Sequence, residues 1–357
     1  MRKSMAIFLL VIFSFCIFAV TSLWKFNIGS SIVHCPGVDG QFVYVIDGEN
    51  SLYKLSLDGK VVWKVTISRG FSSSPSIDKN GNVYIGSWDG GIYKIGKDGR
   101  ILWRYKTEKY VFSTPALGED AIYVGSQDGN FYALSLQGKL LWNFKTEGGI
   151  YSSSGIDKDG NLIFASSDGY VYKLDSFGKL LWRFKIGMET NSSPAIRSNG
   201  DILIGSYDKS LYCISSEGKL IWKFTSDGGI YSSPVIDKDG VVYFCTEEGT
   251  LYAVNFSGRK LWELQTGSNI YSTPVIGEDG VVYFANQYGD VYAVNSKGKQ
   301  LWKLSIDSVR ASLNLCNSLL IIVTENGMVN ALKVSSKNVM KSDWPKFMKD
   351  IKNNGRF

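Results

Sequence analysis

Residues 86–107 read GSWDGGIYKIGKDGRILWRYKT, and near copies of this stretch return along the chain. The next two copies are GSQDGNFYALSLQGKLLWNFKT at residues 125–146 and SSDGYVYKLDSFGKLLWRFKI at residues 166–186. A tryptophan marks the same place in each unit, and successive tryptophans are 39 or 40 residues apart: Trp24, Trp63, Trp103, Trp142, Trp182, Trp222, Trp262 and Trp302. A constant period of this length is typical of a repeat architecture.

Each unit contains four short apolar runs separated by turns. The order is a segment such as SSPVI, a DKDG turn, VVYFC, a second turn, LYAV, an SxxGK turn and finally LLWKF. Alternating apolar runs between Gly-containing turns predict a four-stranded antiparallel meander. A period near 40 residues with four strands is typical of a β-propeller blade. Eight inner segments are readable, beginning near Ser31, Ser73, Ser113, Ser153, Ser193, Ser233, Ser272 and Ala311.

The two ends of the chain complete each other. Seven inner segments are followed by a tryptophan strand, but the eighth has none, whereas SLWKF at residues 22–26 is such a strand without a blade before it. We therefore predict an all-β, eight-bladed β-propeller of four-stranded antiparallel blades, with the last blade closed by Leu23–Phe26. Closure in this way removes an exposed sheet edge. The segment around Trp344 contains Pro345 and lacks the LLWKF pattern, so we expect it to lie over a neighbouring blade.

The N-terminus predicts export. Arg2 and Lys3 precede an apolar run, residues 6–20, which contains one polar residue, Ser14, and is shorter than the roughly 20 residues of a membrane span. Residues 1–22 are therefore a signal peptide or an N-terminal membrane anchor, residues 23–335 the propeller and residues 336–357 a C-terminal tail. We expect the protein to be periplasmic, extracellular or anchored at the cell envelope. Residues 6–20 are the segment expected to make any contact with the membrane.

Composition gives little support for catalysis or nucleic-acid binding. The net charge of +6 is small and scattered, which argues against a nucleic-acid partner. The single histidine, His34, has no His or Cys partner at metal spacing, and no G-x-S-x-G motif occurs. The cysteines after Cys16 form no close pair and are expected to be buried apolar residues: Cys35, Cys213, Cys245 and Cys316. We predict no catalytic residue, no metal and no cofactor.

Two recurrent features have structural interpretations. The DKDG turns, such as residues 157–160, lack the later Glu of a calcium loop and predict Gly-containing hairpins. The Ser pairs that precede the inner-strand prolines are expected to cap backbone groups beside the central channel.

The segments FYALSLQGKLLW (131–142), LYAVNFSGRKLW (251–262) and VYAVNSKGKQLW (291–302) resemble the PQQ-like repeat family of β-propellers. The tail WPKFMKDIKNNGR (344–356) also resembles a segment that accompanies such repeats. One branch of the family comprises quinone-dependent dehydrogenases and another comprises BamB-like envelope scaffolds. The dehydrogenases have large insertions and often an adjacent Cys–Cys pair, which this sequence lacks. The resemblance therefore implies a noncatalytic scaffold, with a PQQ-dependent oxidoreductase as the alternative.

One face of the predicted propeller varies from blade to blade. It receives the outer-to-inner connections and the turns after the second strands, and variable side chains on a constant frame are typical of recognition loops. The candidate partner-binding residues are Phe71, Trp88, Phe112, Gln127, Tyr151, Tyr207, Tyr231, Glu247, Tyr271, Gln287 and Tyr288. Packing around the channel mouth is an equal explanation for the aromatic members.

The expected partner of this face is a protein, bound by a monomeric propeller. A glycan- or cell-wall-binding module is a further alternative, because aromatic mouths also suit sugars. On the opposite face, a cation follows the Gly of successive SxxGK turns, and a solvated ring is the expected role: Lys60, Arg100, Lys139, Lys179, Lys219, Arg259 and Lys299.

Overall fold

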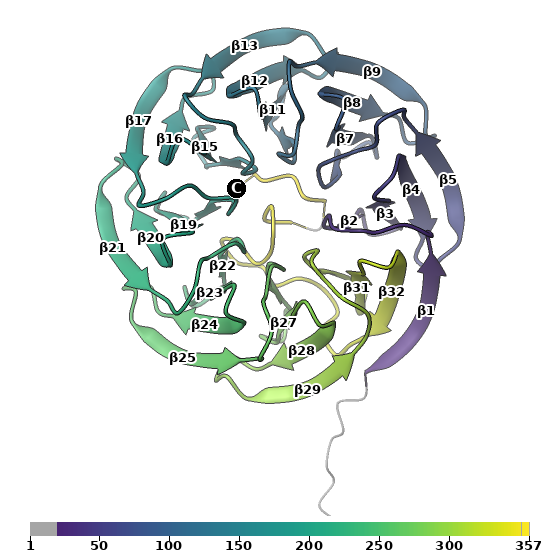
Figure 1. The fold of residues 1–357 in the computed structure, drawn as a ribbon, viewed down its shortest axis with the longest axis vertical. Coiled ribbons are helices and arrows are strands. Elements are labelled where there is room, and N and C mark those ends of the chain that lie inside the picture. The colour runs from purple at the N-terminus through teal and green to yellow at the C-terminus, as the bar shows by residue number, and fades with distance from the viewer. Residues whose placement is uncertain (1–19, 351, 357) are drawn as a thin grey trace, which may run out of the picture.

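The computed structural model describes residues 20–350 and 352–356 and shows eight four-stranded antiparallel sheets arranged around a central channel (Figure 1). No helix is found in these residues, and so none that is long and apolar enough to cross a membrane. The predicted all-β, eight-bladed propeller is confirmed. We number the blades 1 to 8 by the order of their inner strands.

The strands of the blades fall into four concentric sets. The inner strands are β2 (Gly37–Val38), β6 (Ser76–Ile77), β10 (Ala116–Leu117), β14 (Gly155–Ile156), β18 (Ala195–Ile196), β22 (Val235–Ile236), β26 (Val275–Ile276) and β30 (Asn314–Cys316). The second strands are β3 (Phe42–Ile46), β7 (Val83–Gly86), β11 (Ala121–Gly125), β15 (Leu162–Ser166), β19 (Ile202–Ser206), β23 (Val242–Cys245), β27 (Val282–Ala285) and β31 (Leu319–Val323).

The third strands are β4 (Ser51–Ser56), β8 (Gly91–Ile95), β12 (Asn130–Ser135), β16 (Tyr170–Leu174), β20 (Ser210–Ile214), β24 (Thr250–Val254), β28 (Asp290–Val294) and β32 (Met328–Lys333). The outer strands are β5 (Val61–Thr66), β9 (Ile101–Lys106), β13 (Leu140–Lys145), β17 (Leu180–Lys185), β21 (Leu220–Thr225), β25 (Lys260–Gln265), β29 (Gln300–Ser305) and β1 (Thr21–Asn27).

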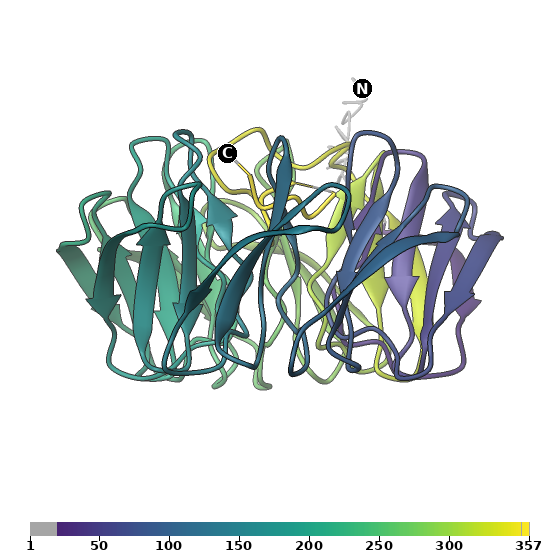
Figure 2. The same ribbon diagram turned by 90° about the horizontal axis from the view of Figure 1, so that it is seen from above.

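The turns between strands lie on two faces of the ring (Figure 2). One face carries the connections from each outer strand to the next blade and the turns between second and third strands, and we call it the mouth face. The tail face carries the other two turns of each blade and the C-terminal tail.

Polar side chains shape the turns of the tail face. In the SxxGK turn of blade 4, Asp175 Oδ1 accepts hydrogen bonds from the backbone N–H groups of Phe177 and Lys179, both at 2.9 Å. Gly178 in the same turn has φ of +85°, which a residue with a Cβ rarely adopts. The DKDG turn of the same blade repeats this arrangement with Asp157 and Gly160. The predicted hairpin turns are confirmed.

The recurrent tryptophans join each outer strand to the following blade. Seven of these indole N–H groups, those from Trp24 to Trp262, donate to a backbone carbonyl in the turn before the outer strand of the next blade, at 2.7–3.0 Å. The ring also covers the Gly of that turn so closely that an added Cβ would lie 2.6–3.1 Å from it. Each tryptophan is half-buried at the blade boundary, which explains why a Trp and a Gly recur together.

Apolar side chains fill the space between blades. Phe131 of blade 3 stacks on Phe164 of blade 4 with ring centroids 4.1 Å apart, and Phe164 in turn stacks on Tyr172. The second and third strands are buried almost completely because both of their faces meet a neighbouring blade. The described cysteines, Cys35 among them, are likewise buried and unpaired, as expected.

The N-terminal strand closes the ring. β1 pairs antiparallel with β32, with Thr21 opposite Lys333 and Asn27 opposite Met328. The eighth sheet therefore has the order β1-β32-β31-β30, and the predicted closure is confirmed.

The expected position of the tail was wrong, because the tail enters the channel instead of lying over one blade (Figures 1 and 2). Its carbonyls accept hydrogen bonds at 2.7–3.0 Å from inner-strand N–H groups of five blades: Ile77, Leu117, Ile156, Ile236 and Ile276. An inner strand has a neighbour on one side only, so these N–H groups face the channel and need an acceptor when buried. The tail supplies that acceptor.

Replacing Gly258 by Ala should destabilise the protein by about 1–3 kcal/mol more than replacing Gly240 by Ala. Both glycines have positive φ, +80° and +78°, so both variants carry the same backbone cost. Only a Cβ on Gly258 meets the Trp222 ring, at 2.6 Å, whereas the nearest atom to a Cβ on Gly240 is 3.8 Å away. Chemical denaturation measures the difference, and equal losses would contradict the role given to the tryptophan contact.

Trp344→Ala should lower the free energy of unfolding by about 3–5 kcal/mol, because this tail side chain is 1% exposed and packs among residues of blades 4 to 6. Phe177→Ala, which removes an aromatic ring that is 83% exposed, is the control and should change stability by about 0.5 kcal/mol or less. Similar unfolding midpoints for the two variants would show that the tail contributes little to stability.

Candidate functional site

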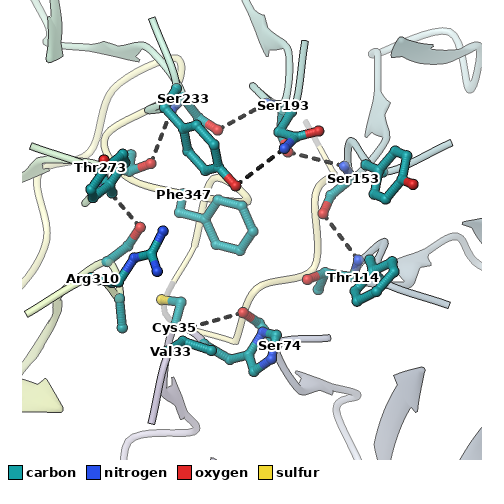
Figure 3. Close-up of a pocket in the computed structure, with 18 of the residues that line it drawn as sticks. Val33, Cys35, Ser74, Thr114, Ser153, Ser193, Ser233, Thr273, Arg310 and Phe347 are labelled. Carbon is teal, nitrogen blue, oxygen red and sulfur yellow. Dashed lines mark hydrogen bonds between the residues drawn. The ribbon is translucent and has the colours of Figure 1, made fainter. Parts of the chain in front are cut away.

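A cavity of about 420 Å³ lies at the channel on the mouth face (Figure 3). Two residues from most blades line it, and Phe347 of the tail contributes from below. The lining residues form two tiers, an inner tier of hydroxyl side chains and an outer tier that differs from blade to blade.

The inner tier is one repeat position seen eight times: Cys35, Ser74, Thr114, Ser153, Ser193, Ser233, Thr273 and Ser312. Within it, hydroxyls accept hydrogen bonds at 2.9–3.0 Å from the backbone N–H at the same position of the preceding blade, for the pairs Cys35–Ser74, Thr114–Ser153, Ser153–Ser193, Ser193–Ser233, Ser233–Thr273 and Thr273–Ser312. The dashed lines of Figure 3 follow these bonds around the channel. We call this set the hydroxyl tier.

The serine that precedes five members of the hydroxyl tier binds within its own blade: Ser73, Ser152, Ser192, Ser232 and Ser272. Ser152, for example, accepts from the N–H of Ala165 at 2.8 Å and donates to its carbonyl at 3.0 Å. The Ser pairs thus cap backbone groups beside the channel, as predicted: the first hydroxyl serves its own blade and the second serves the preceding blade.

The outer tier lies two residues before the hydroxyl tier and consists of Val33, Ser72, Phe112, Tyr151, Asn191, Tyr231, Tyr271 and Arg310. Over blades 2 to 4 its rings form a continuous cluster with the turn residues. Trp88 meets Phe112 edge to face with centroids 4.6 Å apart, and Phe112 stacks on Tyr151 at 5.5 Å. Tyr110 contacts both Trp88 and Phe112. Gln127 donates to the Tyr151 hydroxyl at 2.7 Å.

A second aromatic cluster covers blades 5 to 7. Tyr231 contacts Tyr207 at 5.7 Å and Tyr271 at 5.3 Å between centroids. The guanidinium of Arg310 lies over the Tyr271 ring at 4.7 Å. Burial, followed by the nearby Tyr231 and the Glu247 carboxylate, raises the pKa of Tyr207, so its hydroxyl stays protonated. Because it carries the Arg310 guanidinium, the Glu247 carboxylate and tyrosine hydroxyls, this side of the mouth is more polar than the side over blades 2 to 4.

The structure places the predicted residues at three levels. Trp88 and Tyr288 are exposed, at 40% and 76%. Eight others are partly buried around the mouth: Phe112, Gln127, Tyr151, Tyr207, Tyr231, Glu247, Tyr271 and Gln287.

Phe71 does not belong to this surface, because it is 2% exposed and packs against Tyr93 between blades. Counted from the inner-strand proline, Phe71 occupies the position of Val111 and Ile150, which is buried in each blade, and Ser72 holds the mouth position instead.

Sequence reasoning missed several residues of the mouth. Tyr110, Asn191 and Arg310 lie there, with Asn191 donating to the Tyr231 hydroxyl at 3.1 Å. Alignment of the repeats on Pro75, Pro115 and their equivalents would have identified Asn191 and Arg310, since both share the repeat position of Tyr231. Tyr110 lies outside that register and carries no such signal.

The floor of the cavity holds a buried cation. The Lys346 ammonium is fully buried and donates to the carbonyls of Phe347 and Asp350 and to Asn353 Oδ1, at 2.6–2.9 Å. Burial lowers the pKa of Lys346, and the three oxygens supply the partners that a buried ammonium needs. The contact holds the tail in a compact turn beneath the cavity.

The cavity lining does not suit a metal ion. It contains no carboxylate and a single histidine, His34, whose one imidazole is too few ligands for a metal site. Across the described part of the chain, no group of three or more His, Cys, Asp or Glu side chains is placed to hold a metal. Hydroxyls, aromatic rings and one guanidinium can instead bind polar and aromatic groups of a partner.

Ser233→Ala should destabilise the protein by about 1–3 kcal/mol, because it leaves the buried N–H of Ser193 without its acceptor. Ser113→Ala is the matched control: its hydroxyl is buried and has no hydrogen-bond partner among the described residues, so its loss should cost less. Thermal and urea unfolding of both variants give the comparison. Equal stability of the two would contradict the role of the hydroxyl tier.

Solved structures similar to this chain include one of BamB from Moraxella catarrhalis, with a TM-score of 0.78 and 15% identity over 88% of this chain and 100% of that one. The computationally designed Ika8 protein has a TM-score of 0.75 and 16% identity over 88% and 98% of the two chains. A europium-containing methanol dehydrogenase has a TM-score of 0.76 and 12% identity over 88% and 93%. At these identities the likeness concerns the fold alone.

A search of curated proteins returned no significant match. The family model described as outer membrane protein assembly factor BamB matches residues 21–154 and 167–345, from the closing strand to the first residues of the channel-filling tail. This protein therefore belongs to the BamB family of PQQ-like repeat β-propellers.

Proposed function

We propose that this protein is an exported, noncatalytic scaffold that binds a protein partner through its mouth face, in the assembly of the cell envelope. The observation that carries the proposal is the aromatic cluster of blades 2 to 4, in which Trp88 and Tyr110 are each 40% exposed. Their rings are held by edge-to-face contacts with Phe112.

Such a surface suits protein recognition. Large aromatic side chains dominate binding energy at protein interfaces, and rings that are already fixed lose little conformational freedom on binding. Beside the cluster lie hydrogen-bonding groups such as Gln127 and Asn191, which can set the orientation of a partner. Across the mouth, Glu247 and Arg310 add charges of both signs.

The comparisons support the same proposal. The matching family model is described as an outer membrane protein assembly factor, and a structure of a BamB protein covers 88% of this chain. An assembly factor must leave the cytoplasm, and the apolar run of residues 6–20 is consistent with export. These residues lie outside the described part of the chain apart from Val20.

The alternatives have weaker support. A quinone-dependent oxidoreductase of this fold is represented by the europium-containing methanol dehydrogenase, which shares 12% identity. The cavity lacks the carboxylates that a calcium or lanthanide ion prefers, so its residues do not fit such a centre. A glycan-binding role uses the same aromatic rings and is distinguished by experiment.

A photoreactive amino acid placed at position 88 or 288 should form crosslinks in cells to an envelope protein, whereas the same probe at position 177 should not. Trp88 and Tyr288 are exposed on the mouth face, and Phe177 is 83% exposed on the tail face. Mass spectrometry identifies the adducts. Trp88→Ala should then reduce the yield from position 288 without changing the thermal unfolding midpoint.

Identical adducts from positions 88, 288 and 177, or no adduct from the first two, would count against a partner on the mouth face. Tight binding of PQQ with calcium, together with dye-linked alcohol oxidation, would replace the scaffold by an enzyme. Binding to a glycan array that is abolished by Trp88→Ala would replace it by a sugar-binding module.

A further inference from the structure

One sector of the tail face is strongly basic. It lies at the outer ends of blades 6, 7 and 8, where β25, β29 and β1 follow one another around the ring (Figure 1). We call it the basic edge, and its exposed residues are Arg259, Lys260, Lys297, Lys299, Lys333 and Lys337.

The cations of the basic edge are poorly neutralised. Lys260 pairs with Glu263 at 2.9 Å, but no carboxylate of the described residues lies within 4.0 Å of the charged groups of the other five. The equivalent cations of blades 1 and 2 differ, since Lys60 pairs with Asp58 at 2.7 Å and Arg100 with Asp98 at 3.5 Å. The turn cations of blades 3 to 5, Lys139, Lys179 and Lys219, also lack a carboxylate within 4.0 Å among the described residues, but each of those turns carries a single cation. The turns of blades 6 and 7 carry two cations each, so the density of positive charge is higher on this side of the ring.

Exposed apolar side chains accompany these cations. Phe256 stands in the turn of blade 6 and is 69% exposed, and Leu261 follows two residues after Arg259 and is 51% exposed. Leu23 of β1 is also 51% exposed. Aromatic and aliphatic groups next to Lys and Arg are the combination that binds at the interface of an anionic bilayer.

The chain itself enters the ring at this edge. Thr21, the first residue of β1, lies opposite Lys333, and Val20 packs against the core of blades 7 and 8. The described chain therefore has no flexible linker between the propeller and residues 1–19. Those residues carry Arg2, Lys3 and nearly all of the apolar run. A membrane that holds this run must come close to the basic edge.

We infer that the basic edge lies against an anionic lipid bilayer. In this arrangement the cations contact lipid phosphates, and Phe256, Leu261 and Leu23 enter the interfacial region. The cavity is lined by residues of the mouth face, which lies on the other side of the ring from the basic edge, so the mouth face stays accessible while the edge is bound. The inference rests on residues 6–20 serving as a membrane anchor, and it is independent of the partner proposed for the mouth face.

The test uses the full chain reconstituted in vesicles of phosphatidylcholine, with or without phosphatidylglycerol, and hydrogen exchange as the readout. Peptides covering residues 255–262 and 295–301 should exchange roughly threefold more slowly, or slower still, when phosphatidylglycerol is present. High salt should remove this difference, because it screens the attraction between lysines and lipid headgroups. Equal exchange in both kinds of vesicle would overturn the inference.

Charge reversal locates the contact. Arg259→Glu, Lys297→Glu and Lys299→Glu together should abolish the slowing by phosphatidylglycerol. The matched control reverses Lys60, Lys139 and Lys179, which hold the same turn positions on blades 1, 3 and 4, and should keep it. An equal loss in the control would show that charge, and not this edge, is responsible, and would also overturn the inference. The mouth-face variant Met188→Ser, exposed by 53%, should behave as wild type.

Discussion

The contact between the tryptophan of one blade and the glycine of the next, repeated at seven blade boundaries, is the interaction on which the ring depends. A four-stranded blade buries little by itself, because both of its faces are apolar and need a neighbour. The indole bridges the gap at the rim by hydrogen bonding to the next blade, and its ring occupies the space that a Cβ would take. A residue with positive φ and no side chain is needed beneath it, which only glycine satisfies without strain. The repeat therefore keeps a pair of residues 35 or 36 positions apart, a Trp within an outer strand and a Gly in a turn.

Two further sets of hydrogen bonds stabilise the ring around the channel. The hydroxyl tier links the starts of neighbouring blades, and the tail satisfies inner-strand N–H groups of five blades from the other side of the channel. Both sets of contacts solve the same problem: the strands at the axis have one neighbour each, and their backbone groups that face the channel are buried. The tail also converts an open channel into a cavity with a floor, formed by Phe347 and supported by the buried Lys346. A stable ring and a closed cavity thus have a common origin.

The two faces of the ring have different constraints. On the mouth face the hydroxyl tier is uniform, whereas the residues two positions earlier range from Val33 through Tyr151 to Arg310. Backbone geometry requires the first set and leaves the second free, so the second can acquire a surface suited to one partner. On the tail face the turns are alike in backbone, yet the neutralising acids of blades 1 and 2, Asp58 and Asp98, are replaced in blades 6 and 7 by Ser257 and Lys297. Both proposed surfaces, the aromatic mouth face and the basic edge, thus arise from side chains that differ between blades with the same backbone.

The sequence by itself determined the strand order, the blade number and the closure by β1, because a period of 39 or 40 residues counts the blades and an unpaired SLWKF strand must find an edge. It also determined the turn chemistry at Asp157 and Gly178. Which repeat position faces the cavity needed the tertiary structure: the packing of the blades buries the position shared by Phe71 and Ile150, and Ser72 at the next position lines the cavity. The same holds for the tail, whose sequence shows no strand pattern. Its place in the channel is decided by unpaired N–H groups on five separate blades, a set of donors that exists only once the ring has closed.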